Sequence, residues 1–135
     1  MDQRTRDEPI LLAVNGTLMR GLALNKNLTD VGATFTREDA TCPDYRLYSI
    51  DDIHPAMQRV AHGGAAIQLE IWAVPTAGLI SVLQGEPVGL CIGKIELADG
   101  REVLGVLGEA LLCAGGEEIT AYGGWRAYVA SREAA

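Results

Sequence analysis

The clearest periodic pattern in the chain lies between Ala65 and Val74. Every second residue from Ile67 to Ile71 is a branched apolar one, whereas Gln68, Glu70 and Trp72 occupy the alternate positions. A period of two is typical of a β-strand, because successive side chains of a strand point to opposite faces of the sheet. We therefore expect a strand here, ended by the proline that follows it.

Four more segments carry information about strands and loops. Ile10–Val14 is a short apolar run, residues 33–38 are rich in β-formers, and residues 45–50 alternate with period two. Each of these predicts a strand. Residues 51–61, which include His54 and Pro55, instead favour a loop or an irregular crossing.

The dipeptide Asp99-Gly100 is the strongest hairpin signal in the chain. It predicts a β-hairpin made of residues 90–98 and 102–113, because this pair suits a tight two-residue turn. Gly105 and Gly108 in the second arm indicate bulges or a bend, which a strongly coiled sheet or barrel would need.

Helical spacing appears in three places. Apolar residues recur every three or four positions from Leu24 to Val31, and Gly32 follows as a helix-ending glycine. A second helix is expected from Pro75 to Gly85, and a last helical turn or two within residues 125–133. The elements together predict an α+β fold of about six mostly antiparallel strands with two or three short helices.

The length of 135 residues favours a single domain. We expect residues 1–9, which are mostly charged or polar, to form a flexible N-terminal segment and residues 10–131 to form the domain. The net charge of −7 and the lack of a dense basic cluster argue against nucleic acid and against an anionic membrane surface. Without an apolar leader or a spanning run, a soluble cytoplasmic protein is expected.

The cysteine and histidine content indicates neither a disulfide framework nor a metal site. Cys42, Cys91 and Cys113 are widely spaced, and His54 and His62 fit no common ligand pattern. Cys42 as a nucleophile would need a base that the sequence does not identify. Nucleotide-binding glycine motifs are absent as well, so a nucleotide-binding Rossmann fold is not supported.

The segment Asn15–Gly21 is the first candidate binding site. It lies between an expected strand and an expected helix, so its backbone N–H groups can turn toward a small oxyanion. Gly16 would permit a tight turn, Thr17 adds a hydroxyl group, and Arg20 adds a guanidinium. The alternative is an ordinary connecting loop with a solvated Arg20.

Glu70 is the second candidate, because it is a carboxylate within an otherwise apolar strand. If its face is exposed, Glu70 is an ordinary surface residue; if that face lines a cavity, burial would raise its pKa and suit a general acid or base. Glu86 follows the second expected helix and is interpreted as a solvated helix-end residue. Tyr45 and Tyr48 lie on opposite faces of one strand, so only one can enter a pocket. Trp125 is either part of a cleft or a buried core residue.

Several stretches resemble a known family from about Leu12 to Val129. They are Gly21-Leu-Ala-Leu-Asn25, Tyr45-Arg-Leu-Tyr48, Gly63-Gly-Ala-Ala-Ile67, Glu70-Ile-Trp-Ala-Val-Pro75, Ile92-Gly-Lys-Ile-Glu-Leu-Ala-Asp-Gly100 and Tyr122-Gly-Gly-Trp-Arg-Ala-Tyr128. In this order they resemble the C-terminal domain of allophanate hydrolase, here as a stand-alone protein. The loop at residues 15–21 and the strand at residues 70–74 are also similar to the wider gamma-glutamylcyclotransferase-like fold.

The resemblance implies a small, mostly antiparallel β-barrel with flanking short helices. It also implies a domain without cofactors that decarboxylates N-carboxycarbamate, a small dianion, to carbamate and CO2 beside a separate amidase. We assign Glu70 as the catalytic residue. The residues assigned to substrate binding are Gly16, Thr17, Leu18, Met19, Arg20, Asn25, Tyr45 and Trp125. The partners expected are this anionic substrate, the amidase and a second copy of the chain in a homodimer.

The sequence departs from both of the related patterns. Leu18 stands where the related hydrolase domains carry a histidine, so Glu70 or a tyrosine would have to supply the proton. Asn15 and the residues ahead of Glu86 differ from the cyclotransferase pattern. Two further hypotheses therefore stay open: a non-catalytic binding or oligomerisation module for an amidase, and a gamma-glutamylcyclotransferase-type acyltransferase.

Overall fold

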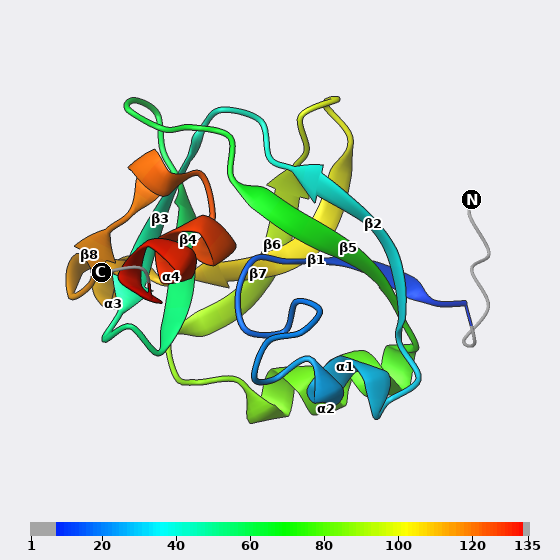
Figure 1. Ribbon diagram of the computed structural model, residues 1–135. Coiled ribbons are helices and arrows are strands. Elements are labelled where there is room, and N and C mark those ends of the chain that lie inside the picture. Colours follow the sequence, from blue (N-terminus) through cyan, green and yellow to red (C-terminus); the bar gives the residue numbers. More distant parts are fainter. Residues whose placement is uncertain (1–7, 134–135) are drawn as a thin grey trace.

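The computed structural model describes residues 8–133, which form two β-sheets (Figure 1). The larger sheet has the strand order β2-β5-β1-β7-β6 and the smaller one the order β4-β3-β8. The larger sheet is built from β1 (Ile10–Val14), β2 (Thr34–Ala40), β5 (Gln68–Val74), β6 (Leu90–Glu96) and β7 (Glu102–Gly108). The smaller sheet is built from β3 (Tyr45–Ile50), β4 (His54–Arg59) and β8 (Glu117–Glu118).

The sheets confirm the α+β class and its mostly antiparallel pairing, but they do not form the expected barrel. All neighbouring strands of the described chain run antiparallel except β1 and β7, which are parallel. β2 and β6 are the outer strands of the larger sheet, and an isolated bridge between Thr41 and Leu97 lies beyond their ends. One bridge is not a continuous ladder, so residues 8–133 contain no closed barrel.

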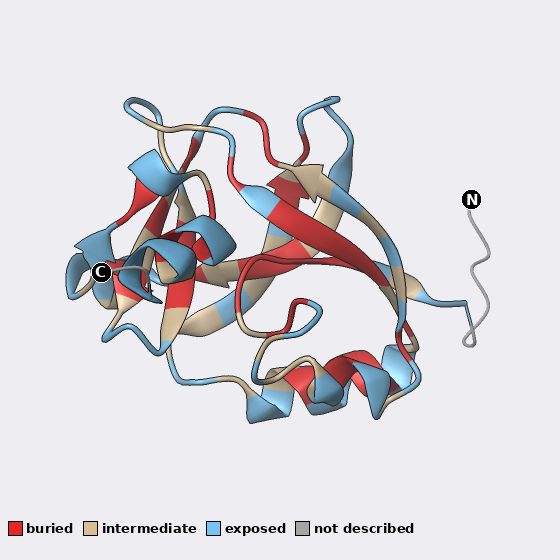
Figure 2. Ribbon diagram, viewed as in Figure 1, coloured by how far each residue is buried: buried red, intermediate tan, exposed pale blue. Residues whose placement is uncertain are grey.

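β5 is an inner strand of the larger sheet, because it lies between β1 and β2. Its residues Leu69 to Trp72 are all buried, so both faces of the strand are covered (Figure 2). Glu70 lies opposite Val14 of β1 and Glu38 of β2. Of the two alternatives for the face that carries Glu70, the exposed one is wrong, because Gln68 alone of Gln68, Glu70 and Trp72 is exposed.

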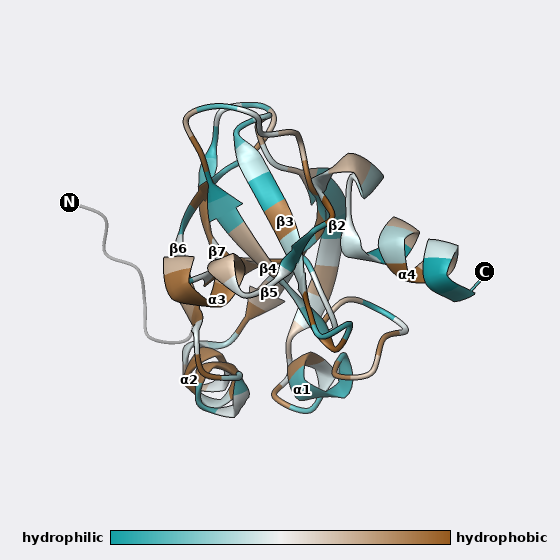
Figure 3. Cartoon of the chain, turned by 90° about the vertical axis from the view of Figure 1, so that its left-hand side faces the viewer, coloured by the Kyte–Doolittle hydropathy of each residue, from teal (hydrophilic) through white to brown (hydrophobic). Residues whose placement is uncertain are grey.

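Helices cover the larger sheet from one side. α1 (Lys26–Thr29) and α2 (Thr76–Gly85) lie side by side beneath it in the two views (Figures 1 and 3). A Cβ atom on Gly78 would lie 2.8 Å from Val31 Cγ2, so this close approach needs a glycine. Pro75 is the N-cap of α2 and not its first residue, a difference of one position from the expectation.

The remaining helices lie beside the smaller sheet. They are α3 (Ala110–Ala114), the 3-10 turn η1 (Thr120–Tyr122) and α4 (Trp125–Glu133). The second hairpin arm was expected to run to residue 113, but β7 ends at Gly108 and α3 follows. Apolar character alone does not distinguish a short helix from a strand, which explains the error.

The prediction of a loop at residues 51–61 is wrong for most of its length, because residues 54–59 form β4. Pro55 is tolerated there since β4 is the outer strand of its sheet. Asp51 and Asp52 make the turn from β3 with φ angles of 54° and 58°, in the left-handed region that short polar residues enter most readily.

Most of the expected N-terminal segment, residues 1–7, lies outside the described residues, and the bounds of the domain stay a prediction. No helix within residues 8–133 is long and apolar enough to cross a membrane.

Candidate functional site

The loop after β1 is held by hydrogen bonds within its own backbone and by one from the side chain of Asn25. Within it, Met19 N–H donates to the carbonyl oxygen of Gly16 at 3.0 Å, and Leu24 N–H donates to that of Thr17 at 2.9 Å. Asn25 Nδ2 donates to the carbonyl oxygen of Leu18 at 2.8 Å. Asn25 therefore braces the loop, and its assignment to substrate binding stays a prediction.

Consecutive residues of this loop line two different cavities. Leu18, with Gly16 and Thr17, lines a cavity of about 200 Å³ that we call the Glu86 cavity. Met19 lines a cavity of about 300 Å³ that we call the Glu70 cavity. The residues assigned together from the sequence are thus divided between two sites.

Glu70 lines the Glu70 cavity and is 1% exposed. Its Oε1 accepts the backbone N–H of Arg20 at 2.9 Å and the indole N–H of Trp72 at 3.1 Å. Its Oε2 accepts Arg20 Nε at 3.2 Å and Arg126 Nη2 at 3.0 Å. Both oxygens of the carboxylate are occupied by donors.

These contacts decide the charge of Glu70. Burial is the largest single influence and raises its pKa, but the hydrogen bonds from Arg20, Trp72 and Arg126 together outweigh it and hold the pKa below its ordinary value. The expectation that Glu70 in a cavity would have a raised pKa is therefore wrong, because the hydrogen bonds reverse the effect of burial. The carboxylate stays ionised, and its catalytic role stays a prediction.

Arg20 is not the solvated cation of the ordinary-loop interpretation. Besides Glu70, its guanidinium contacts Glu38 at 3.0 Å and lies 3.6 Å from the ring centroid of Phe35. Its carbonyl oxygen accepts Arg126 Nη2 at 2.6 Å. The Arg20 guanidinium is thus engaged with two carboxylates and an aromatic ring, although its side chain remains 44% exposed.

The Glu86 cavity contains the second carboxyl group. Glu86 follows α2 as its C-cap residue and is half-buried, in contrast to the solvated residue expected there. Its side chain has no hydrogen-bond or ion-pair partner within the described chain, and burial raises its pKa. This is the behaviour that the sequence analysis had assigned to Glu70.

Three backbone amides border the same cavity. The N–H groups of Gly16, Thr17 and Leu18 donate to no acceptor among residues 8–133, whereas those of Met19 and Arg20 are spent on Gly16 and Glu70. Unpaired amides at a cavity wall are suitable donors to an anion. Of the loop segment expected to bind an oxyanion, residues 16–18 therefore keep backbone N–H groups available for an anion, and residues 19 and 20 do not.

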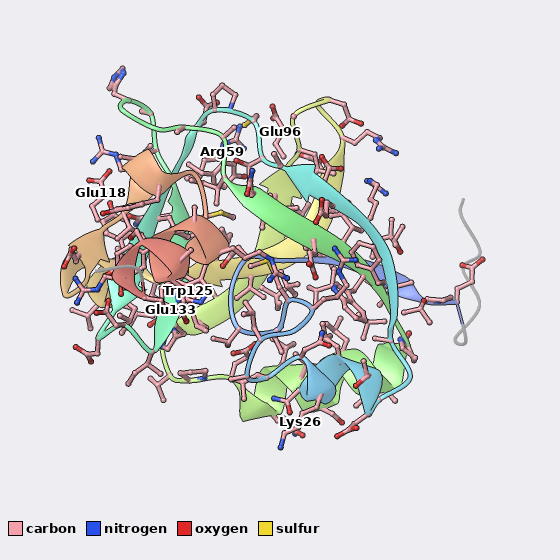
Figure 4. The ribbon with its side chains drawn as sticks, in the orientation of Figure 1. Lys26, Arg59, Glu96, Glu118, Trp125 and Glu133 are labelled. Carbon is pink, nitrogen blue, oxygen red and sulfur yellow. The ribbon has the colours of Figure 1, made fainter. Side chains whose placement is uncertain are left out.

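Tyr45 and Trp125 differ in position. Tyr45 is fully buried, its hydroxyl oxygen accepts Glu96 N–H at 3.0 Å, and it lines neither cavity. Figure 4 shows Arg59 and Glu96 close together, where Arg59 Nη2 lies 3.2 Å from Glu96 Oε1. Trp125, on α4, lines the Glu70 cavity. Tyr45 thus has the contacts of a core residue.

The described residues contain no group of three or more His, Cys, Asp and Glu side chains that could hold a metal ion. Cys42 and Cys113 are buried, Cys91 is exposed, and all three are free thiols.

Comparison with known proteins decides the family. The sequence profile of the allophanate hydrolase C-terminal domain matches residues 10–130. The chain belongs to this family. This confirms the resemblance found in the sequence.

Two solved structures are similar along almost the whole chain. A uropathogenic E. coli-specific protein is 56% identical, with a TM-score of 0.88 over 90% of this chain and 95% of that one. Kluyveromyces lactis allophanate hydrolase is 31% identical, with a TM-score of 0.86 over 91% of this chain but 21% of that one. A mouse aig2-like protein, 18% identical with a TM-score of 0.59 over 76% of this chain and 78% of that one, shares the fold alone.

Among curated proteins, the urea amidolyase of Saccharomyces cerevisiae is 32% identical over 126 residues. The match covers 88% of this chain and 7% of that protein, so the chain spans a small part of this much longer relative.

Proposed function

We propose that this allophanate hydrolase C-terminal-like domain binds a small carboxylated nitrogen compound in the Glu86 cavity and that Glu86 donates a proton to the substrate nitrogen. The observation that carries the proposal is the raised pKa of a half-buried carboxyl group in the cavity bordered by the unpaired amides of residues 16–18. A carboxyl group with a raised pKa keeps its proton at higher pH than an ordinary glutamate does.

The reaction that fits this arrangement is decarboxylation of N-carboxycarbamate. One N–C bond breaks, CO2 leaves, and the electron pair stays on nitrogen. The nitrogen takes the proton of the Glu86 carboxyl group, which gives carbamate, and Glu86 regains a proton from water. The unpaired amides of Gly16, Thr17 and Leu18 bind the carboxylate that remains.

Glu70 has a different part in this proposal. An ionised carboxylate with four hydrogen-bond donors is a poor proton donor, but it fixes the loop at Arg20. We therefore propose that Glu70 is a positioning residue, in place of the catalytic role assigned from the sequence.

Malonate tests the binding step, because it carries two carboxylates one atom apart as the substrate does. It should raise the melting temperature of the wild type, since a ligand of the native state stabilises it, and acetate at equal ionic strength should raise it less. A melting temperature that malonate leaves unchanged contradicts the proposal.

Turnover tests the proton donor. Allophanate supplied with a separate allophanate amidase generates N-carboxycarbamate, and CO2 release above the uncatalysed rate measures this domain. Glu86→Gln should reduce that increment by about 10²- to 10⁴-fold, the usual contribution of a general acid. Glu109→Gln, at an exposed glutamate outside both cavities, is the matched control. An unchanged increment in Glu86→Gln refutes the assignment, and 5-oxoproline release from gamma-glutamyl peptides would favour the acyltransferase hypothesis.

A second candidate function is a non-catalytic module that binds an amidase or a second copy of the chain. Val88 is 95% exposed and Leu111 is 85% exposed, and their segments are joined by the hydrogen bond from Glu109 N–H to the carbonyl oxygen of Gly89 at 2.8 Å. Neighbouring exposed apolar residues favour a contact surface. Light scattering of the wild type and of Leu111→Ser tests it: a dimer that the substitution dissociates supports the module, and a monomer at all concentrations argues against self-association.

A further inference from the structure

His54 is the group in the Glu86 cavity that the sequence did not single out. It begins β4 and is half-buried, and its side chain lines the cavity together with Glu86 and the loop residues 16–18. His54 and Glu86 are 32 positions apart in the sequence, so no local spacing links them.

Contacts of the residues on either side of His54 fix its position. The turn before it is tied to α4, since Tyr128 Oη donates to Asp52 Oδ1 at 2.5 Å and Arg132 Nη2 lies 3.1 Å from Asp52 Oδ2. The residue after it, Pro55, packs so closely against the loop after β1 that a Cβ atom on Gly16 would lie 2.6 Å from Pro55 Cδ. The imidazole is therefore held by a rigid backbone next to the unpaired amides.

One hydrogen bond of the His54 ring indicates which nitrogen carries a proton. His54 Nδ1 lies 3.0 Å from the carbonyl oxygen of Pro55. A carbonyl oxygen only accepts, so Nδ1 carries the proton of this bond, and Nε2 is left for a ligand. Nε2 then either accepts a proton or, in the imidazolium form, donates one.

The cavity needs a cation if it binds a dianion. Its charged or titratable lining side chains, among the described residues, are His54 and Glu86, and neither lysine nor arginine borders it. The loop, β1 and β7 contribute no titratable group, and on the turn before His54 the carboxylate of Asp52 is engaged with Tyr128 and Arg132. Amide dipoles alone leave one of two negative charges largely uncompensated.

We propose that His54, as an imidazolium, binds the second carboxylate of the substrate through Nε2–H and thereby selects dianions over monoanions. This inference rests on the proposed function. The amides of residues 16–18 take one carboxylate, His54 takes the other, and Glu86 faces the nitrogen between them.

The test compares the malonate Kd of the wild type with that of His54→Gln by calorimetry between about pH 5.5 and about pH 8.5, the range in which imidazoles ordinarily lose their charge. The ionisation of malonate and that of Glu86 are common to both proteins and largely cancel in the ratio of the two Kd values. We expect a ratio of about 10 to 100 at the acid end, the worth of one hydrogen bond between charged groups, and a ratio approaching one at the alkaline end.

His62→Gln is the control, because His62 is exposed and lines neither cavity. If His54→Gln does not fold, as judged by circular dichroism, His54→Asn takes its place. Equal Kd values for the wild type and the His54 variant at every pH overturn the role of His54 and leave the proposed function standing. A wild type that does not bind malonate at any pH overturns both.

Discussion

The backbone N–H of Arg20 donates to Oε1 of Glu70 at 2.9 Å, across 50 positions of the sequence. This bond joins the loop after β1 to β5, an inner strand of the larger sheet. The same carboxylate binds the guanidinium of Arg20 and that of Arg126 on α4, so three elements meet at one side chain. Glu70 thereby fixes the loop whose opposite side borders the Glu86 cavity.

Glu70→Gln should lower the free energy of unfolding by about 1–3 kcal/mol. Breaking a fully buried ion pair costs about 3–5 kcal/mol, but Arg20 and Arg126 are more than 40% exposed, so water compensates part of the loss. Urea unfolding at neutral pH measures the change.

Glu38→Gln is the matched control for this experiment. It also removes a carboxylate from Arg20, but the Glu38 side chain is 75% exposed, so the change should stay within about 0.5 kcal/mol. A Glu70 variant as stable as this control would show that the network does not hold the loop.

The raised pKa of Glu86 predicts that the stability of the protein depends on pH. A carboxyl group with a raised pKa binds its proton more tightly in the folded state than in the unfolded state. Stability contributed by this group is therefore complete below the ordinary glutamate pKa of about 4.3 and is lost as the pH rises through the folded-state pKa.

Glu86→Gln abolishes this loss. The variant should gain stability relative to the wild type between about pH 4 and pH 7, as followed by thermal unfolding. Glu109→Gln, at an exposed glutamate outside the cavity, is the control. A constant difference between wild type and Glu86→Gln over this range would mean that Glu86 titrates as an ordinary surface carboxylate.

The sequence predicted the elements that local signals specify. The alternation around Glu70 indicated β5, and Asp99-Gly100 indicated the hairpin of β6 and β7, because both patterns depend on residues that are neighbours along the chain. β4 was missed since Pro55 reads as a breaker wherever the strand order is unknown.

The division of the site into two cavities could not be predicted in this way. The donors that lower the pKa of Glu70 come from Arg20 and Arg126, 50 and 56 positions away, and no periodicity indicates them. The burial of Glu86 likewise depends on the loop, β4 and β7 meeting around it. A carboxylate just after a helix and before a proline looks solvated until those long-range contacts are known.

Gly16→Ala should destabilise the protein by about 1–3 kcal/mol and weaken malonate binding. The new Cβ atom would lie 2.6 Å from both Cγ and Cδ of Pro55, and a proline ring has little freedom to move, so the loop and β4 must separate. Urea unfolding and calorimetry measure the two effects.

Gly85→Ala serves as the control substitution. Nothing lies within 4 Å of its added Cβ atom, and alanine favours the helical conformation, so stability should be unchanged or rise by up to about 1 kcal/mol. If Gly16→Ala behaved in the same way, the close contact between the loop and β4 would not constrain the Glu86 cavity.

Tyr128→Phe should act on the turn that carries His54. The hydrogen bond from Tyr128 is the largest cause that lowers the pKa of Asp52, followed by that from Ser49, so its loss should let this pKa rise toward the ordinary value of about 3.9. A lowered carboxyl pKa contributes stability above that value, and the contribution is lost as the pH falls through the folded-state pKa. The variant should therefore unfold at lower urea concentration than the wild type at neutral pH, and the difference should shrink below about pH 4.

Tyr122→Phe is the comparison for this last effect, because Tyr122 is 47% exposed and its hydroxyl group makes no hydrogen bond within residues 8–133. If the turn positions His54, Tyr128→Phe should also weaken malonate binding at acid pH, whereas Tyr122→Phe should not. Both tyrosines belong to the same aromatic contact, with ring centroids 5.2 Å apart, so a shared packing effect would change both variants alike. Only a loss confined to Tyr128→Phe assigns the effect to its hydrogen bond with Asp52.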